Sequence, residues 1–359
     1  MRKLILISAL LSLLLSNAIG QQPPGVSLVV VQFSQPPSFA TVAKTPFRYN
    51  KSFAFSFHHD DGAKDIYSHA FKFLNGGVVN GITYPGLKFT DGVGNDINFR
   101  MSAAIFSFEQ GGAIDGRDPY GPYAAINVTW PELIEMYQAG WGIYNHNLTS
   151  ANAGNYVYEI RRNHSYVKRK TQAATQGGVD MQVFVNPAGD INYTQPAFNQ
   201  GYRAAYREGY TFGVPHFNVN STWNPQQVPM GRTNIYTGIS LSGLVNAIAA
   251  ASVGGQNHWG SAFTHSVVNP GWGLSFQSFM NQMNAIASSY GKNGADNIWM
   301  TTEEEILNYR IVHDLTTVSS VLAGNLLAIT LTGNIPTNLR FYALSLLVNA
   351  DAPISNIII

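Results

Sequence analysis

The sequence predicts an α/β fold, a distorted (β/α) barrel of about seven strands with a small C-terminal β appendage. Short apolar runs alternate with amphipathic stretches over about 260 residues, which is the order of a parallel sheet covered by helices. Polar side chains follow three of these runs, and a closed barrel carries its chemistry at the carboxyl ends of its strands.

The barrel is expected over residues 52–314. Its strands are predicted at residues 53–57, 103–108, 141–144, 181–185, 210–214, 262–265 and 298–300. Its helices are predicted at residues 66–74, 131–138, 156–175, 196–208, 241–251, 276–290 and 302–312. Pro131 suits a first helical turn, and Thr302 with Glu305 forms a capping box at the start of the last helix.

The N-terminus has the features of a signal peptide over residues 1–20. Two basic residues precede an apolar run, and Ala18 and Gly20 stand at the −3 and −1 positions of a cleavage site. The apolar run is shorter than the roughly 20 residues that span a bilayer, so the mature chain is expected to hold no integral membrane segment. We therefore expect a secreted or periplasmic protein, cleaved near Gly20.

Two other segments flank the predicted barrel. Residues 21–51 form a Pro- and Gln-rich N-terminal extension with one strand over residues 26–33. Residues 315–359 alternate like antiparallel strands around turns, so they are expected to form an incomplete sandwich or an edge module.

The composition restricts the classes of partner. Charged residues make up 11% of the chain, against roughly 25% in an average soluble protein, and the net charge is +1. Neither nucleic-acid binding nor electrostatic recruitment to a membrane is expected from such a chain. The sequence has no Cys, so it has no disulfide.

Three predicted strands end in side chains that can do chemistry. The first is followed by Asp60, Asp61 and Gly62, and adjacent carboxylates suit a site where one binds a metal and the other accepts a proton. The second ends at His146 and the third at His265. A single histidine at a strand end is usually structural, but three polar strand ends in one barrel favour a functional site.

These segments resemble, in order, the hallmark motifs of the polysaccharide deacetylases, carbohydrate esterase family 4 with its NodB-like homology domain. The resemblance covers roughly residues 52–312. It implies that Asp60 is the general base, that Asp61 and His146 bind a divalent metal, with zinc expected, and that His265 is the general acid. It also implies a polysaccharide or oligosaccharide substrate.

Two positions depart from the family pattern. Ser150 stands where the family has a second metal-binding histidine, so the third ligand is left open among Ser150, Asn152, His58, His59, His164 and water. The arginine that steadies the general base in the family is replaced in register by Asn186. One of the paired histidines, His58 or His59, is a candidate to compensate for it.

The predicted function is a metal-dependent hydrolase that removes N- or O-acetyl groups from a polysaccharide. The alternative is a carbohydrate-binding protein on a catalytically impaired deacetylase barrel. A glycoside hydrolase needs two acids about 5–9.5 Å apart on opposite strands, which adjacent Asp60 and Asp61 do not supply. Trp223, Trp259 and Trp272 are candidates to stack on sugar rings, although core packing is the commoner use of tryptophan.

Overall fold

The computed structural model describes residues 4–7, 26–109, 114–149, 154–208, 216–221, 223–225, 227–236 and 238–359. Contacts divide the chain into two compact units. The barrel unit comprises Ser52–Phe89 and Ile97–Glu304, and the β unit comprises Met1–Lys51, Thr90–Asp96 and Glu305–Ile359. Each unit is described by itself. No helix in the described part of the chain is long and apolar enough to cross a membrane.

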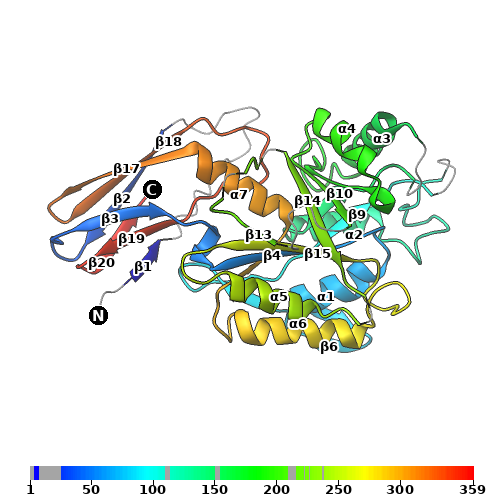
Figure 1. Ribbon diagram of the computed structural model, residues 1–359, viewed down its shortest axis with the longest axis horizontal. Coiled ribbons are helices and arrows are strands. Elements are labelled where there is room, and N and C mark those ends of the chain that lie inside the picture. The colour runs from blue at the N-terminus through cyan, green and yellow to red at the C-terminus, as the bar shows by residue number, and fades with distance from the viewer. Residues whose placement is uncertain are drawn as a thin grey trace. The chain divides into compact units, whose positions relative to one another are not determined.

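Seven parallel strands close the barrel, which confirms the predicted fold class (Figure 1). Each strand pairs with the next, and the last pairs again with the first. In order they are β4 (Phe53–His59), β9 (Ser102–Ile105), β10 (Gly142–Asn145), β11 (Val183–Val185), β12 (Ala204–Glu208), β14 (Val228–Asn234) and β15 (His258–Thr264). Strand β13 (His216–Asn218) adds to β15 outside the ring, and β16 (Ile298–Met300) adds to β4.

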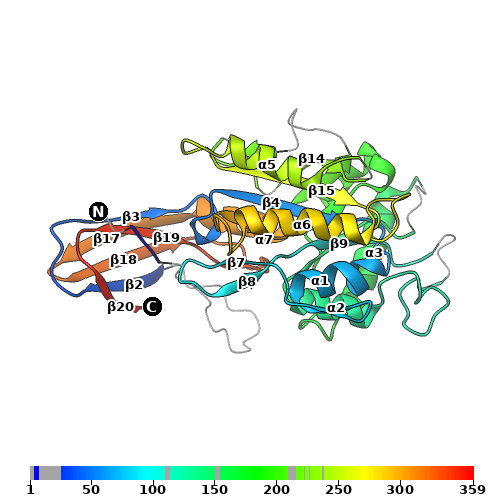
Figure 2. The ribbon, with the colours of Figure 1, turned by 90° about the horizontal axis from the view of Figure 1, so that it is seen from below.

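Helices follow most of these strands in the chain. They are α1 (Lys72–Asn75), α2 (Trp130–Gln138), α3 (Tyr156–Lys170), α4 (Thr194–Asn199), α5 (Leu241–Ala251), α6 (Phe276–Tyr290) and α7 (Glu303–Leu315). A π-helical segment, Ile66–Phe71, leads into α1, and two short hairpins follow α1: β5 (Gly77–Val79) with β6 (Ile82–Tyr84), and β7 (Lys88–Thr90) with β8 (Asp96–Asn98). Helix α5 packs beside β15 and β4, and α6 packs against α5 (Figure 2).

Local sequence explains where several helices begin. Asn155, Ser240 and Ser275 accept hydrogen bonds from backbone N–H groups in the first turns of α3, α5 and α6. Glu132 accepts from the backbone and hydroxyl of Thr129 at the start of α2. Strand β4 is buried along its whole length, as expected for a parallel strand covered on both faces.

The barrel has the expected number of strands, but some of them are formed by other segments of the chain than the sequence predicts. Residues 196–208 were predicted as one helix; instead α4 ends at Asn199, Gly201 has a φ of 90°, and the chain continues as β12. Strand β14 was not predicted because Pro229 and Gly231 interrupt its apolar pattern. The strand predicted at residues 298–300 lies outside the ring, and that at 210–214 lies outside the described residues.

The β unit holds two antiparallel sheets. The first has the order β17 (Thr316–Ala323), β18 (Leu326–Gly333), β2 (Val26–Phe33) and β20 (Ile354–Ile358). The second has β19 (Leu346–Ala350) between β1 (Leu4–Ile7) and β3 (Ala40–Lys44). Val29, Val31 and Phe33 alternate into a core with Leu327 and Ile329. Thus the segments 21–51 and 315–359, treated separately in the sequence analysis, contribute strands to the same sheets.

Candidate metal and catalytic site

The four predicted site residues lie at the same end of the barrel. Asp60 and Asp61 follow β4 directly, His146 follows β10, and His265 follows β15. These strands are parallel, so their carboxyl ends meet at one edge. Strand β15 pairs with β4 up to Thr264 and His59, which sets His265 beside Asp60 in register. The Asp60 N–H accordingly donates to the Thr264 carbonyl at 2.9 Å.

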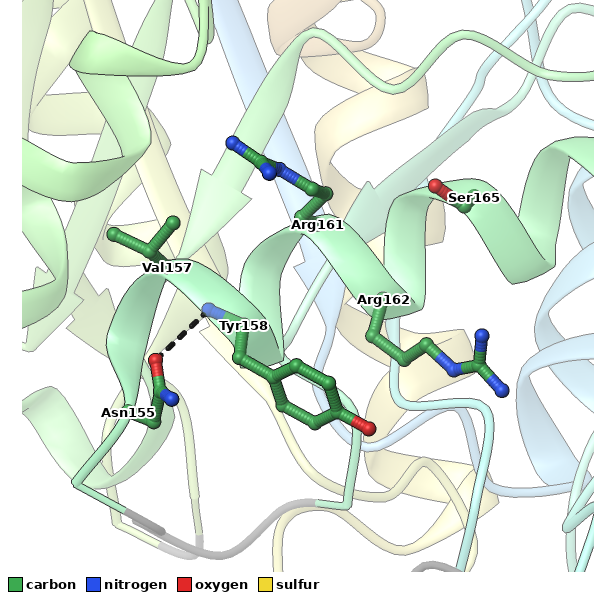
Figure 3. A pocket seen from close by; sticks show the side chains of 6 residues that line it. All are labelled: Asn155, Val157, Tyr158, Arg161, Arg162 and Ser165. Carbon is green, nitrogen blue, oxygen red and sulfur yellow. Dashed lines mark hydrogen bonds between the residues drawn. The ribbon is translucent and has the colours of Figure 1, made fainter.

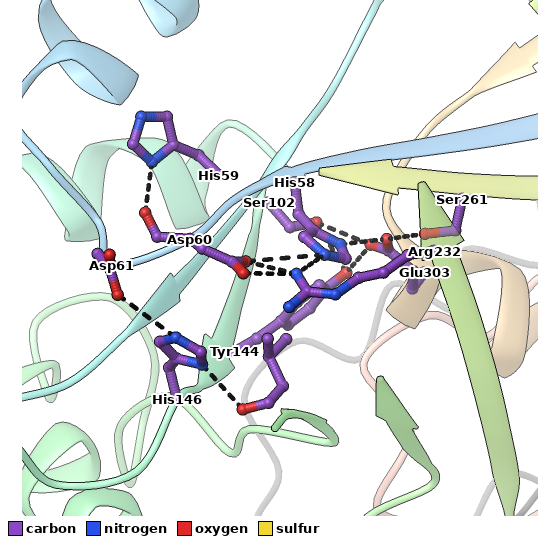
Figure 4. A network of polar contacts seen from close by, with 11 residues as sticks. His58, His59, Asp60, Asp61, Ser102, Tyr144, His146, Arg232, Ser261 and Glu303 are labelled. Carbon is purple, nitrogen blue, oxygen red and sulfur yellow. Dashed lines mark hydrogen bonds and ion pairs between the residues drawn. The ribbon is translucent and has the colours of Figure 1, made fainter. Parts of the chain in front are cut away.

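Asp61 and His146 face each other. Oδ1 of Asp61 lies 3.4 Å from Nε2 of His146 (Figure 4). The other ring nitrogen, Nδ1, lies 2.8 Å from the Val185 carbonyl, which can only accept, so Nδ1 carries a proton. A neutral His146 therefore points the lone pair of Nε2 at the carboxylate. Two electron-rich atoms in this arrangement need a cation or a proton between them.

The pKa of His146 is consistent with this geometry. Burial by itself would lower the pKa of the imidazole, but the hydrogen bond to Asp61 and the charges of Asp60 and Asp61 raise it above its ordinary value. The Asp61 carboxyl has its pKa lowered: burial would raise it, and the His146 hydrogen bond outweighs that effect. Without a metal, a shared proton therefore stabilises the pair, and a divalent cation would displace that proton.

A buried arginine holds the backbone at Asp61. Asp61 and Gly62 have φ values of 64° and 58°, in the left-handed region. Arg117, which is fully buried, donates to the carbonyl oxygens of Asp61 at 2.6 Å and Gly62 at 2.7 Å, and also to those of Phe106 and Val128. A Cβ on residue 62 would lie 2.7 Å from Ile105 Cγ2, so the turn requires glycine there. Arg117 thus fixes the direction of the Asp61 side chain.

Asp60 has a different partner. Nη1 of Arg232, on β14, lies 2.7 Å from Oδ1 and 2.6 Å from Oδ2 of Asp60, and both residues are buried. Burial by itself would raise the pKa of the Asp60 carboxyl, but the charge and the hydrogen bond of Arg232 hold it well below its ordinary range. Asp60 is therefore a carboxylate at neutral pH.

Arg232 supplies a partner that was not expected. The resemblance implied that Asn186 replaces an arginine beside the base, but a guanidinium lies against Asp60 all the same, from a strand that the sequence analysis did not predict. Asn186 is buried and donates to Thr194. The Arg232 guanidinium also lies 3.7 Å above the Phe263 ring, a cation–π contact that fixes its plane.

The two histidines before Asp60 have separate environments. His58 points into the network of Figure 4, with Nε2 at 2.6 Å from Arg232 and Nδ1 at 2.7 Å from Glu303. His59 points away from it. Its Nδ1 lies 2.7 Å from the Asp60 carbonyl and its Nε2 lies 3.1 Å from Oδ1 of Asp65. Of the two, only His58 is placed to act on Asp60.

His59 belongs to a second buried cluster, which links two loops of the site. Both of its ring nitrogens face acceptors, so His59 is an imidazolium. Asp65 raises the pKa of His59 against the effect of burial. The other oxygen of Asp65 accepts from the Ser266 hydroxyl at 2.7 Å and the Val267 N–H at 2.6 Å. The cluster therefore ties the loop after β4 to the loop that carries His265.

His265 is half-buried beside the two aspartates. Its ring contacts Phe263 edge-on, with the ring centres 5.4 Å apart. Burial lowers the pKa of His265, and the opposing charges of Asp60 and Asp61 do not fully offset this. A lowered pKa makes the imidazolium a stronger acid but reduces its population near neutrality.

Three of the candidates for the third metal ligand, His58, His59 and His164, have their ring nitrogens in other contacts. His58 and His59 have both ring nitrogens in the contacts given above, and His164 is held by Tyr202 at 2.7 Å and Asp180 at 3.0 Å. Ser150 and Asn152 lie outside the described residues. Within the ranges that the structure describes, no three His, Asp or Glu side chains gather to hold a metal. Asp61 and His146 are thus a pair that needs a further ligand.

A separate surface pocket of about 330 Å³ lies along α3 (Figure 3). It is lined by Asn155, Val157, Tyr158, Arg161, Arg162 and Ser165, none of which was predicted as a site residue. Its two arginines are exposed and give it positive charge.

Three supporting residues escaped the sequence analysis: Arg117, Arg232 and Glu303. Arg117 and Arg232 lie 56 and 172 positions from the aspartates they contact, so no local spacing connects them. Glu303 stands in a run of three glutamates, a pattern typical of an exposed helix start. Of the three, only Arg232 had a local signal of burial in the sequence, because it stands between the apolar residues Met230 and Ile235.

Comparisons with known proteins give the following likenesses. No protein-family model matches the sequence, and no curated protein matches it. The solved structure described as T48 deacetylase with substrate aligns over 70% of this chain and 89% of its own, at 10% identity and a TM-score of 0.35. A Streptococcus pyogenes deacetylase, PplD, in complex with acetate aligns over 64% and 69%, at 12% identity and a TM-score of 0.31. The Xyl-CE4 domain of a multidomain xylanase from the hindgut metagenome of Trinervitermes trinervoides aligns over 60% and 92%, at 11% identity and a TM-score of 0.29.

Proposed function

We propose that this chain is a metal-dependent deacetylase that removes acetyl groups from a polysaccharide. The observation that carries the proposal is the convergence of a metal-binding pair, an ionised carboxylate and a histidine at one end of a closed parallel barrel. Asp61 and His146 supply two ligands, and Asp60 and His265 stand beside them as base and acid. The convergence agrees with the roles that the family resemblance implies.

The donor set fits a divalent cation. A carboxylate oxygen and a lone-paired imidazole nitrogen are both good zinc ligands, and the hydrogen bond from His146 to the Val185 carbonyl is the orientation that metal-binding histidines commonly show. A cation held by Asp61 and His146 would supply the Lewis acid that hydrolysis of an acetyl group needs.

The other residues would move protons. Asp60, kept ionised by Arg232, would take the proton of the water that attacks the acetyl carbonyl. His265, on the neighbouring strand, would give a proton to the departing sugar nitrogen or oxygen. General acid–base help of this kind contributes typically about 10² to 10⁴ in rate.

Exposed aromatic rings support a carbohydrate as the substrate. Two of them lie in the loops that follow barrel strands: Tyr236 after β14 and Trp272 after β15. Trp272 is 68% exposed. Flat rings with a polar edge suit the faces of sugar rings. Trp259, by contrast, is fully buried against Phe217 and Trp223, and is part of the core.

The test is release of acetate from chitin oligomers, peptidoglycan and acetylated xylan. The protein is first freed of metal with a chelator and then assayed with and without added zinc. Zinc-dependent release from one substrate supports the proposal and also decides between amide and ester. Binding to these polymers without release of acetate would instead support a carbohydrate-binding protein on an impaired barrel.

We also propose that the protein is secreted or periplasmic, with its leader cleaved near Gly20. Of residues 1–20 the structure describes only Leu4–Ile7, as strand β1 paired with β19. Cleavage would remove β1 and leave β19 paired with β3. N-terminal sequencing of the protein from its native host tests this proposal: a mature start near Gln21 is expected, and an intact Met1 would contradict it.

A further inference from the structure

A chain of buried contacts leads from Glu303 to Asp60. Glu303 is the first residue of α7 and is fully buried. Its Oε1 lies 2.7 Å from Nδ1 of His58, whose Nε2 lies 2.6 Å from Nη1 of Arg232. The same Nη1 reaches both carboxylate oxygens of Asp60. Figure 4 shows these side chains in one line of contacts.

The direction of each hydrogen bond follows from the groups involved. A guanidinium can only donate, so Nε2 of His58 accepts from Arg232. Nδ1 then carries the single proton of a neutral ring and donates it to Glu303. Arg232, which can only donate, and Glu303, which accepts, therefore require the same tautomer of His58, and Glu303 holds the ring so that its lone pair faces Arg232.

Glu303 is ionised in this setting. Its carboxylate also accepts from the Tyr144 hydroxyl at 2.7 Å, the Ser102 hydroxyl at 3.1 Å and the Ser261 hydroxyl at 3.2 Å. Burial by itself would raise the pKa of Glu303, but His58 and these donors lower it. Charge-assisted hydrogen bonds are the strong ones, so the carboxylate is held from several strands at once.

Structural stability alone is a weak reason for such a chain. A buried ion pair often contributes no more to stability than apolar side chains of similar volume would. The effect of this chain of contacts on geometry is specific, however, because a single atom, Nη1 of Arg232, donates to both His58 and Asp60. If His58 offered an N–H instead of a lone pair, it would repel that guanidinium and displace it from Asp60.

We propose that Glu303 is a positioning residue: through His58 it fixes the Arg232 guanidinium, which in turn fixes the orientation of the Asp60 carboxylate. The proposal rests on the function proposed above, in which Asp60 is the general base. The position of Glu303 at the start of α7 is fixed by contacts with four barrel strands.

The test compares Glu303→Gln with Glu305→Gln, a matched change two positions further along α7. Glu305 is also buried, but its ion pair is with Arg48. Supporting partners of catalytic groups are commonly worth about 10- to 100-fold in activity, so kcat of Glu303→Gln should fall by that factor. Its KM and its zinc affinity should stay within about twofold. Glu305→Gln should keep kcat.

A second measurement does not depend on activity. Nitrogen-15 NMR of the histidine rings should show His58 as the neutral Nδ1–H tautomer in the wild type and in Glu305→Gln, and no longer as that single form in Glu303→Leu, whose side chain cannot accept the Nδ1 proton. Arg232→Ala should recover part of its lost turnover when guanidinium ion is added, since the ion can reoccupy the place beside Asp60. A merely structural role for Glu303 does not predict the change at His58, and the rescue of Arg232→Ala tests the separate link from Arg232 to Asp60.

The outcomes separate the two proposals. Unchanged kcat in Glu303→Gln, or an unchanged His58 tautomer in Glu303→Leu, would overturn the positioning role. If the wild type releases no acetate from any substrate, the proposed function fails instead. The positioning role is then decided by a crystal structure of Glu303→Gln: an Arg232–Asp60 contact that persists would overturn it, and a displaced Asp60 would support it.

Discussion

Asp60 and Asp61 are neighbours in the chain, yet their carboxylates have different surroundings. Asp60 is buried against Arg232, whereas the Asp61 side chain keeps 32% of its surface exposed and faces His146. A fully buried, ion-paired carboxylate is held in one orientation, which suits a proton acceptor. A partly exposed carboxylate has room beside it for a metal. The two residues are therefore suited to different tasks, in the order that the sequence analysis assigned.

Substituting each aspartate separately tests this division. Asp60→Asn should lower kcat by about 10² to 10⁴ and leave zinc affinity nearly unchanged, because it removes only the base. Asp61→Asn should remove both zinc binding and turnover. Zinc titration by calorimetry, together with acetate release, measures the two effects. Equal loss of zinc affinity in the two variants would show that the roles are wrongly assigned.

His265 provides a second test at this scale. His265→Ala should lower kcat by about 10² to 10⁴ with zinc affinity unchanged, because a general acid acts on the leaving group and not on the metal. Zinc affinity and turnover are measured on the same preparation. Loss of zinc binding in this variant would make His265 the missing third ligand.

The loops after β4 and β15 act together because Asp65 joins them. Asp65 lies in the loop after β4, pairs with His59 at the end of that strand, and accepts from Ser266 and Val267 of the loop after β15. Burial would raise the pKa of Asp65, but His59 and these donors lower it well below its ordinary range. The loops that carry Asp60 and His265 are thus joined by a buried cluster of Asp65, His59, Ser266 and Val267.

This cluster should make stability depend on pH. The lowered pKa of Asp65 contributes stability that is present above its unfolded pKa of about 3.9 and lost as pH falls through the folded pKa. The raised pKa of His59 contributes stability that is present below about 6.5 and lost as pH rises through the folded pKa. Both contributions are complete between these two unfolded values.

Asp65→Asn should therefore cost stability mainly in that window. Removing one partner of a buried pair costs about 3–5 kcal/mol, since the other charge is left without compensation. Urea unfolding of wild type and variant at about pH 5 and about pH 9 measures the effect, with the larger loss expected near pH 5. The same loss at both pH values would mean that His59 is not charged in the folded protein.

At the scale of the whole molecule, pairing of β4 and β10 with β9 between them brings Asp61 and His146 together. Asp61 and His146 lie 85 positions apart in the chain, so the unfolded protein does not hold them side by side. A ligand that binds only the folded state stabilises it, by about 2.7 kcal/mol at a free concentration of 100 times Kd.

Zinc should therefore raise the Tm of the barrel unit. For a domain of roughly 150–250 residues each kcal/mol is worth about 2–4 °C, so a shift of about 5–10 °C is expected under that condition. Scanning calorimetry with and without zinc measures the shift, and Asp61→Asn serves as the control that should lose it. If added zinc left the Tm of the wild type unchanged, that result would argue against a metal site formed by Asp61 and His146.

The sequence by itself determined the fold class and the four principal site residues as candidates. Apolar runs, helical periodicity and caps are local properties, which is why β2, α5 and α6 have the bounds that the pattern predicts. The motif residues also stand at strand ends, and parallel strands place such ends together. Their chemical roles still await the substitutions proposed above.

Tertiary structure decided which strands close the ring and what surrounds each aspartate. Strand β14 lacks a strand-like pattern and forms because β12 and β15 pair with it on both sides. Arg232 reaches Asp60 only because that strand exists, and Glu303 reaches His58 only because α7 begins beside the barrel strands. Contacts between residues so distant in the chain depend on closure of the sheet, a physical condition that no local pattern of residues records.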